Sequence, residues 1–267
     1  MNAPRLPVTA VIPTFNEQDR IREAACSASA WADEVIVVDG GSTDETVSAA
    51  LSAGIRVLSL SGKTIGAQRN LGASNARNPW VFALDTDERV SDELRAQLAR
   101  VLATPKHRAY RVRMKNIYLG RERKRGRWGR DWHVRVYRRE LRYCESRVHE
   151  GLEHVADIGT LRGPVLHTPY RDLSHQLTKM ITYARWGAMD LHAKGLHISA
   201  FGLFGRPVWR FLRDYLAYGN FLDGSYGLLS STLTAYSAFL KYAFLYELDH
   251  SDVPQGEPAS AEGETSG

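Results

Sequence analysis

The sequence predicts an α/β fold whose mostly parallel sheet carries helices on both faces, followed by a helical C-terminal extension. Short apolar runs alternate with helical patterns through about the first hundred residues, which is typical of parallel sheets. Polar residues gather where these runs end, as expected at the ligand-binding edge of such a sheet. With 43% hydrophobic and 24% charged residues, a chain of 267 residues can bury a large core.

Four apolar runs are predicted to form buried strands: residues 8–12, 34–38, 55–60 and 81–84. A helical pattern follows each of them. Ser42 and Glu45 match a capping box at the start of the second helix, and Ser91 is placed to cap the fourth. This alternation brings the ends of the parallel strands to one edge of the sheet.

Asp85 and Asp87 follow the fourth run, separated by one residue. In an extended chain, residues two apart project to the same side, so both carboxylates can face one ligand. Carboxylate oxygens suit Mg²⁺ or Mn²⁺, and Mg²⁺ is usually held by one or two carboxylates together with substrate phosphates. The pair therefore predicts a site for a metal ion and a diphosphate, with a solvated turn or a helix cap as the alternative.

The loops after the other strands are also polar. Asp39 ends the second strand, where a carboxylate can accept hydrogen bonds from a base or ribose, and Gly40 and Gly41 allow close approach of the backbone. Further polar residues of these loops are Thr14, Asn16, Glu17, Lys63, Gln68, Arg69 and Asn70. Turn, cap and solvated-helix roles are the alternatives for single residues. The sequence contains neither the dinucleotide-binding glycine motif nor a P-loop.

Taken together, four segments resemble the signature of family 2 glycosyltransferases with the GT-A fold. They are VIPTFNE at 11–17, VVDGGSTDET at 37–46, GAQRNLG at 66–72 and DTDE at 85–88. Trp31-Ala32-Asp33-Glu34 and Val148-His149-Glu150 are similar to the bacterial lipopolysaccharide-core β-glucosyltransferases of that family. The resemblance implies an inverting enzyme that moves a hexose, with glucose as first choice, from a UDP-linked donor to a lipid-linked or lipopolysaccharide-core acceptor.

The resemblance also implies roles for single residues. Asp87 would hold Mg²⁺ or Mn²⁺ on the donor diphosphate, and Asp85 would face the ribose or sugar. The nucleotide-sugar site would comprise Pro13, Thr14, Glu17, Asp39, Gly41, Arg69 and Asp85. The positive charge of the cation suits this chemistry, because the leaving diphosphate gains negative charge during transfer.

An inverting transfer also needs a base for the acceptor hydroxyl. Glu150 is the first candidate, because it lies in the motif that resembles the family's Val-His-Glu and precedes the flexible Gly151. Asp131 is the second candidate. A salt bridge between Glu150 and a nearby arginine is the structural alternative. A polyprenyl-phosphate glycosyltransferase remains a rival interpretation, in which a phosphate oxygen attacks and Glu150 is dispensable.

The net charge of +5 and the basic stretch between 106 and 142, with Trp128 and Trp132, fit anionic partners. A nucleic-acid-binding protein is the rival from another class, but no recognition motif accompanies the stretch. A solvated basic loop and a loop that meets a phosphorylated acceptor or acidic lipid are the other interpretations. Two cysteines without redox or metal spacing, and no apolar leader, indicate a cytoplasmic protein.

Three parts are expected along the chain: a catalytic domain at 1–170, a helical extension at 171–248 and a disordered tail at 249–267. Pro207 is expected to open a helix that carries Arg206, Arg210 and Arg213 on one face, a pattern suited to a membrane surface or to packing. Residues 224–240 carry no charge and are expected to be packed or interfacial, not spanning. Peripheral contact with the inner face of the cytoplasmic membrane is therefore an expectation.

Overall fold

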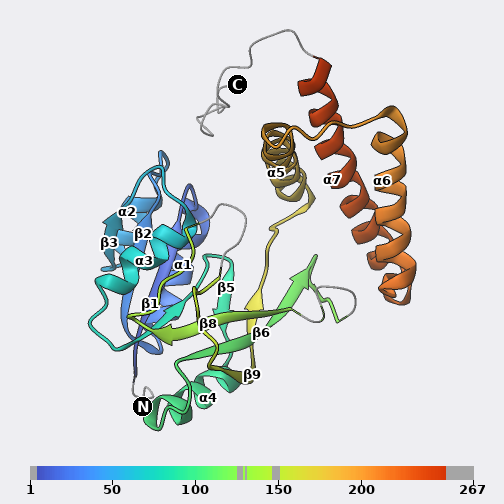
Figure 1. The fold of residues 1–267 in the computed structure, drawn as a ribbon. Helices are drawn as coiled ribbons and strands as arrows, with labels where there is room; N and C mark the ends of the chain where they lie inside the picture. Colours follow the sequence, from blue (N-terminus) through green and yellow to red (C-terminus); the bar gives the residue numbers. More distant parts are fainter. Residues whose placement is uncertain (1–4, 125–128, 130, 146–150, 251–267) are drawn as a thin grey trace. The chain divides into compact units, whose positions relative to one another are not determined.

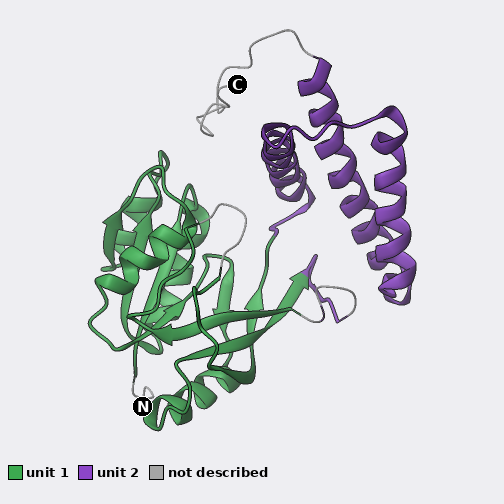
Figure 2. Cartoon of the chain, viewed as in Figure 1, with its two compact units in different colours: residues 1–117, 130–169 green, residues 118–129, 170–267 purple. Residues whose placement is uncertain are grey.

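The chain divides into two compact units (Figure 2). The first comprises residues 1–117 and 130–169, and the second comprises 118–129 and 170–267. The computed structural model describes residues 5–124, 129, 131–145 and 151–250. The grouping of 118–129 with the helical unit is a finding that the sequence pattern does not indicate.

The first unit is built on one mixed sheet (Figure 1). Its strand order is β3-β2-β1-β4-β8-β6-β9-β5. The four strands from β3 to β4 are parallel, whereas β8 runs antiparallel to both β4 and β6, and β5 runs antiparallel to β9. The bounds are β1 (Leu6–Thr14), β2 (Ala32–Asp39), β3 (Arg56–Ser59), β4 (Trp80–Ala83), β5 (Glu88–Val90), β6 (Ala109–Tyr118), β8 (Trp132–Arg138) and β9 (Ile158–His167).

Helices cover both faces of this sheet, as the alternation predicts. Alternate residues of β1 point to opposite faces, so Ala10 and Ile12 pack with α1 (Gln18–Ser29), α2 (Thr46–Ser52) and α4 (Asp92–Ala103). Val11 faces the other side and packs with Ala73 of α3 (Ile65–Ser74). The strands β1, β2 and β4 are therefore buried on both faces, which explains why they are continuous apolar runs, whereas the edge strand β3 is partly exposed.

One of the two predicted helix caps is confirmed. The Ser91 side chain accepts a hydrogen bond from the Leu94 backbone N–H at 3.2 Å, and α4 begins directly after it. The prediction of a capping box at Ser42 and Glu45 was wrong, because α2 begins only at Thr46. Ser42 instead donates its hydroxyl to Asp39, a contact of greater interest for the site.

The second unit is helical. Its bounds are β7 (Arg121–Glu122), α5 (Leu173–Ala193), α6 (Ala200–Leu212), a π-helical segment (Arg213–Ala217), a 3₁₀ turn (Asn220–Asp223) and α7 (Ser225–His250). α5 and α6 both pack against α7 (Figure 1). α7 extends to His250, two residues into the stretch expected to be a tail, and the rest of that stretch lies outside the described residues.

The expectation that Pro207 opens a helix was wrong. α6 begins seven residues earlier, at Ala200, because the Ser199 side chain caps it by accepting a hydrogen bond from the Gly202 N–H at 3.2 Å. Pro207 lies inside α6 and is buried. Across the described part of the chain, no helix combines the length and the apolar character needed to cross a membrane.

Part of the basic stretch has a structural role. The Arg123 guanidinium is buried, donates to the Tyr226 carbonyl at 3.1 Å and to Asn220 Oδ1 at 3.3 Å, and forms an ion pair with Asp223. Arg123, which follows β7 directly, therefore joins that short strand to the helices of its own unit. The basic residues at 125, 127 and 130, and Trp128, lie outside the described residues.

A close contact between α3 and β1 leads to a first prediction. A Cβ on Gly72 would lie 2.3 Å from Val11 Cγ1. Alanine in a helix gains about 1 kcal/mol over glycine, but overpacking a tight core costs about 1–3 kcal/mol. We expect Gly72→Ala to lower the free energy of unfolding in urea, and the loss to disappear in a Val11→Ala background. Ser74→Ala, at an exposed position of the same helix, should change it little. A Gly72→Ala protein as stable as the wild type would contradict this packing.

Candidate active site

The carboxyl ends of β1 and β2 are joined by buried hydrogen bonds. Thr14 and Asp39 are partners in the strand register, and the Gly40 N–H donates to the Thr14 carbonyl at 2.8 Å. The buried Gln68 of α3 donates through Nε2 to the Thr14 carbonyl at 3.2 Å and to the Val38 carbonyl at 3.0 Å. Gln68 therefore links the start of α3 to both strand ends by hydrogen bonds. The sequence pattern does not reveal this role.

Asp39 organises the loop that follows β2. Its carboxylate accepts hydrogen bonds from the Gly41 N–H at 2.9 Å, from the Ser42 N–H at 3.1 Å and from the Ser42 hydroxyl at 2.5 Å. Gly41 has a φ of +101°, and a Cβ there would lie 2.5 Å from Ser61 Oγ, so this position requires glycine. The motif thus shapes a fixed backbone loop at the edge of the sheet.

The loop after β1 is hydrogen-bonded to the loop after β2. The Asn16 N–H donates to Ser42 Oγ at 2.9 Å, and Asn16 Oδ1 accepts from the Thr43 N–H at 2.9 Å. The Glu17 N–H donates to Thr46 Oγ1 at 2.8 Å. Asn16 takes a left-handed φ of +51°, which asparagine tolerates better than most residues. The two loops therefore form one rigid surface.

Pro13 and Thr14 occupy buried positions at the end of β1. Pro13 lies in the strand opposite Val38. Within the described part of the chain, the buried Thr14 hydroxyl oxygen has no hydrogen-bond partner. A buried hydroxyl without a partner costs free energy, and this one lies beneath the surface at the end of β1.

Asp85 lies between two buried arginines. Arg69 of α3 contacts Asp85 Oδ1 at 2.8 Å, and Arg135 of β8 contacts Oδ2 at 2.7 Å. Burial raises the pKa of the Asp85 carboxyl, but the positive charges of Arg135 and Arg69 outweigh this and hold it well below its usual range. Asp85 is therefore ionised at neutral pH. Arg69 also lies over the Tyr143 ring, 4.9 Å from its centroid.

Glu88 is the second carboxylate on Arg135. Its Oε1 contacts Arg135 Nη2, and its Oε2 accepts a hydrogen bond from the Asp85 N–H at 3.1 Å. Burial raises the pKa of the Glu88 carboxyl to about 7, against the lowering effect of Arg135. Glu88 thus fixes both the arginine and the backbone turn that presents Asp85.

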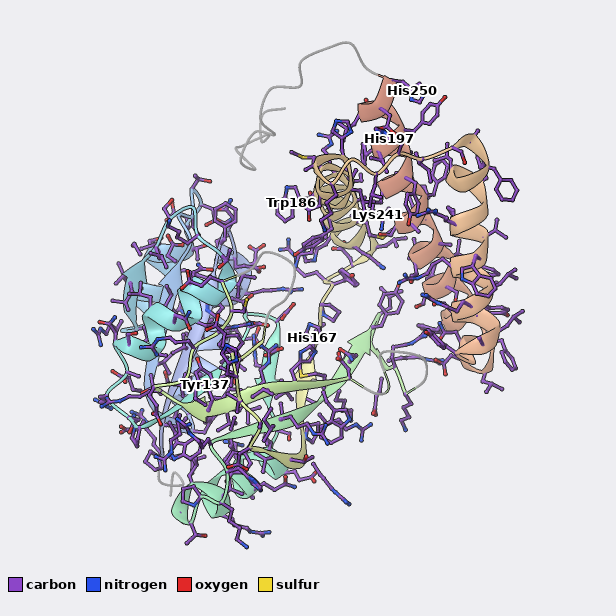
Figure 3. All side chains as sticks on the ribbon, in the orientation of Figure 1. Tyr137, His167, Trp186, His197, Lys241 and His250 are labelled. Atoms are coloured by element: carbon purple, nitrogen blue, oxygen red, sulfur yellow. The ribbon has the colours of Figure 1, made fainter. Side chains whose placement is uncertain are left out.

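Asp87 has different partners from Asp85. Its Oδ2 lies 3.5 Å from Nε2 of His167, at the end of β9, and 3.7 Å from Nη1 of Arg20 in α1 (Figure 3 labels His167). Burial lowers the pKa of His167, but Asp87 outweighs this and raises it. His167 Nδ1 faces Asn116 Oδ1 at 2.6 Å, which fixes the ring. Asp87 therefore has an oriented imidazole beside it.

Asp87 and His167 are the neighbouring groups that could contribute ligands to a metal ion. Among the described residues, no group of three or more histidine, cysteine, aspartate or glutamate side chains is arranged to hold one. The carboxylate of Asp87 and the imidazole of His167 nevertheless supply oxygen and nitrogen ligands of the types that Mn²⁺ accepts. Cations on nucleotides take their other ligands from phosphates and water, so two protein ligands fit such a group.

Of the two candidates for the base, the structure describes Asp131 but not Glu150. Asp131 accepts from Asn116 Nδ2 at 3.2 Å and pairs with His133 Nε2 at 2.8 Å, so it joins the polar chain that leads through Asn116 to His167. Burial raises the pKa of Asp131, but His133 outweighs this and lowers it. Glu150 lies outside the described residues.

The segment on either side of the undescribed residues 146–150 belongs to the site. The Asn70 side chain of α3 binds both backbone groups of Tyr143, donating to its carbonyl at 3.0 Å and accepting from its N–H at 2.8 Å. Tyr143 bridges to Leu152, and the Cys144 N–H donates to the Gly151 carbonyl at 2.8 Å. A Cβ on Gly66 would lie 2.2 Å from the Cys144 carbonyl oxygen. The chain therefore returns to the site at Gly151.

Three residues of the site are given no role by the sequence pattern. Arg135 and His167 come from the antiparallel half of the sheet, whose pairing with β4 and β5 is not visible in the sequence. Alternation in 133–138 predicts that Arg135 lies on one side with Tyr137, but not which partners it meets. Glu88 follows Asp87 directly and looks like part of a solvated turn, although only 1% of it is exposed.

The fold is of the GT-A type, and polar and charged side chains gather at the ends of its parallel strands. The model of the family described as Glycosyl transferase family 2 matches residues 9–156, which is more than half of the chain. The chain belongs to glycosyl transferase family 2, as the resemblance indicates.

Relatives that align over nearly the whole chain are also named as glycosyltransferases. An uncharacterised glycosyltransferase of Rickettsia typhi is 28% identical over 254 residues, covering 90% of this chain and 87% of that protein. The lipopolysaccharide core biosynthesis glycosyltransferase LpsC of Rhizobium meliloti is 29% identical over 261 residues, covering 91% and 93%. The crystal structure of S. aureus TarS 1–349 in complex with UDP-GlcNAc superposes with a TM-score of 0.50 at 14% identity, covering 91% of each chain. This last similarity is one of fold.

The buried ion pair between Arg135 and Glu88 leads to a second prediction. Removing one partner of a buried ion pair leaves an uncompensated charge and costs about 3–5 kcal/mol. We expect Arg135→Gln to lower the thermal stability strongly, and Glu88→Gln in the same chain to restore part of it, because a neutral amide needs no cation. Arg111→Gln, at an exposed position of the neighbouring strand β6, is the control with little effect. A double variant no more stable than Arg135→Gln would refute the charge argument.

Proposed function

We propose that this family 2 enzyme is an inverting, metal-dependent glycosyltransferase. It moves a hexose, with glucose as first choice, from a UDP-linked donor to a lipid-linked or lipopolysaccharide-core acceptor. The name of the relative LpsC supports the class of acceptor, and its match extends through both units of this chain. The donor class is supported by the polar groups at the strand ends.

One observation carries the proposal: groups suited to a nucleoside diphosphate sugar meet at one edge of the sheet. Thr14 and Asp39 end two adjacent parallel strands, and Asp85 follows the third. Ligands of open α/β sheets bind at this edge. The rigid loop after β2 suits the base and ribose, through Asp39, Gly41 and the neighbouring Thr14, Pro13 and Glu17. Asp85, fixed by its arginines, suits the ribose or the sugar.

The diphosphate end of the donor would lie beside Asp87. Asp87 and His167 would hold Mg²⁺ or Mn²⁺, which supplies positive charge to the diphosphate when bound. Arg20, 3.7 Å from Asp87, adds a fixed cation from α1. Arg69 and Arg135 keep Asp85 ionised and immobile, so it can accept hydrogen bonds from donor hydroxyls without reorganising.

Inversion requires attack from the face of the sugar opposite the diphosphate. We assign the proton of the acceptor hydroxyl to Glu150, which precedes the Gly151 that returns to the site. Asp131 is the less suitable base, because its carboxylate already binds Asn116 and His133. The enzyme would act in the cytoplasm at the inner face of the membrane, where lipid-linked acceptors lie.

The metal assignment gives a third prediction. Asp87→Ala and His167→Ala should each weaken Mn²⁺-dependent binding of UDP by more than about 10-fold, because each removes one protein ligand. Isothermal calorimetry with UDP, with and without Mn²⁺, measures this. His107→Ala is the matched control, since this histidine pairs with Asp157 away from the strand ends. If the Asp87→Ala protein keeps wild-type affinity in Mn²⁺, the metal does not bind there.

The base gives a fourth prediction. Glu150→Gln should lower kcat by about 10²–10⁴, the usual contribution of a positioned base, and leave the affinity for UDP unchanged. Asp131→Asn should lower kcat far less. Turnover with a panel of UDP sugars and a lipopolysaccharide-core acceptor measures both. Near-normal turnover by Glu150→Gln would place the base elsewhere, or indicate a phosphate acceptor that needs none.

A further inference from the structure

The outer face of α6 is apolar along its whole length. Phe201 is 88% exposed, Trp209 is 65% exposed and Val208 is 58% exposed. The exposed residues repeat at the spacing of one helical face, which continues into the π-helical segment. We call this the α6 apolar face; it consists of Phe201, Phe204, Val208, Trp209, Leu212 and Leu216.

The opposite side of α6 is the one that packs. Leu203 contacts the core formed with α5 and α7, and Pro207 is buried. Asp214, on the same side, is buried and accepts hydrogen bonds from Arg210 at 3.2 Å and Arg213 at 2.9 Å. Packing within the unit thus uses mainly this side, and the α6 apolar face adds one contact, between Phe204 and Phe239 of α7, whose ring centroids lie 6.0 Å apart.

The charges of this segment are arranged at the border of the α6 apolar face. Residues 200–217 hold three arginines against one aspartate, and that aspartate is buried. Arg206 is exposed and lies over the Tyr242 ring, 4.9 Å from its centroid. Because Arg210 and Arg213 share Asp214, the segment has less free positive charge than its sequence indicates. Apolar contact rather than charge therefore dominates what this surface can bind.

We propose that the α6 apolar face inserts into the interfacial region of an anionic lipid bilayer and lies in the membrane plane. A row of phenylalanine, valine, tryptophan and leucine without an acidic residue, bordered by arginine, matches the chemistry of a bilayer interface. A protein groove is a less complementary partner, because no polar group on this face would pair with it. The inserted residues supply the binding energy, and Arg206 adds attraction to anionic headgroups.

This inference deepens the proposed function, because it names the surface that would bring the enzyme to a lipid-linked acceptor. Vesicle binding needs neither donor nor acceptor, so the two proposals can fail separately. The inference also differs from purely electrostatic attachment through Arg206, Arg210 and Arg213. Insertion of apolar side chains resists salt, whereas exposed charge contacts weaken when salt screens them.

The test is flotation of the full-length protein with phosphatidylcholine vesicles that contain or lack phosphatidylglycerol, in low and high salt. Wild-type protein should float with the mixed vesicles in both salts. Phe201→Ser combined with Trp209→Ser should lower the bound fraction at least about 10-fold, since each side chain loses its apolar burial. Both positions are exposed, so circular dichroism and the melting temperature should stay those of the wild type.

Two matched variants separate the causes. Leu51→Ser, at a position of α2 that is 56% exposed, should float as the wild type does. Arg206→Gln should lower binding only to the anionic vesicles. Wild-type protein that does not float, floats only in low salt, or floats as well after the double substitution would overturn the proposal. A wild-type dimer that becomes monomeric in the double variant would overturn it in favour of a second copy of the chain.

Discussion

The buried contacts of Arg135 with Asp85 and Glu88 link the two halves of the sheet. Arg135 comes from β8, which pairs antiparallel with β4, whereas Asp85 lies in the turn that leaves β4 and Glu88 begins β5 directly after that turn. Arg135 and Glu88 are buried, and a buried charge is costly unless it finds a partner, which each of them has here. Arg69 adds a second cation from α3, so a helix, an antiparallel strand and a turn depend on one cluster.

The same cluster separates the roles of two aspartates that look equivalent in the sequence. Asp85 is fixed by two arginines, whereas Asp87 faces an imidazole and a more distant guanidinium. The first is suited to hydrogen bonding with a neutral hydroxyl. The second keeps a carboxylate oxygen beside a group that can also ligate a cation. Position along the turn, and not residue type, therefore sets the chemistry of each carboxylate.

Much of the fold was predictable because its signals are local. The parallel strands β1, β2 and β4 are continuous apolar runs, and the polar loops at their ends follow from the same pattern. Arg135 and His167 were not predictable as site residues, because each finds its partners 47 or more positions away along the chain. The polar Gln68 was expected at this edge, but its bonds to the Thr14 and Val38 carbonyls, 54 and 30 positions away, were not. Ser42 illustrates a local signal with the wrong outcome, since Asp39 competes for its hydroxyl.

The hydrogen bonds between the loops after β1 and β2 have a consequence for how this enzyme can diversify. Asn16 meets Ser42 and Thr43, and Glu17 meets Thr46, so the two loops are matched almost residue by residue. An inserted or deleted residue in one loop would misalign every contact with the other. If these loops bind the nucleotide as proposed, variants that recognise a different nucleotide should therefore arise by paired replacement of both loops at constant length. Transfer of one loop alone from another protein would break the hydrogen bonds that hold the two loops together.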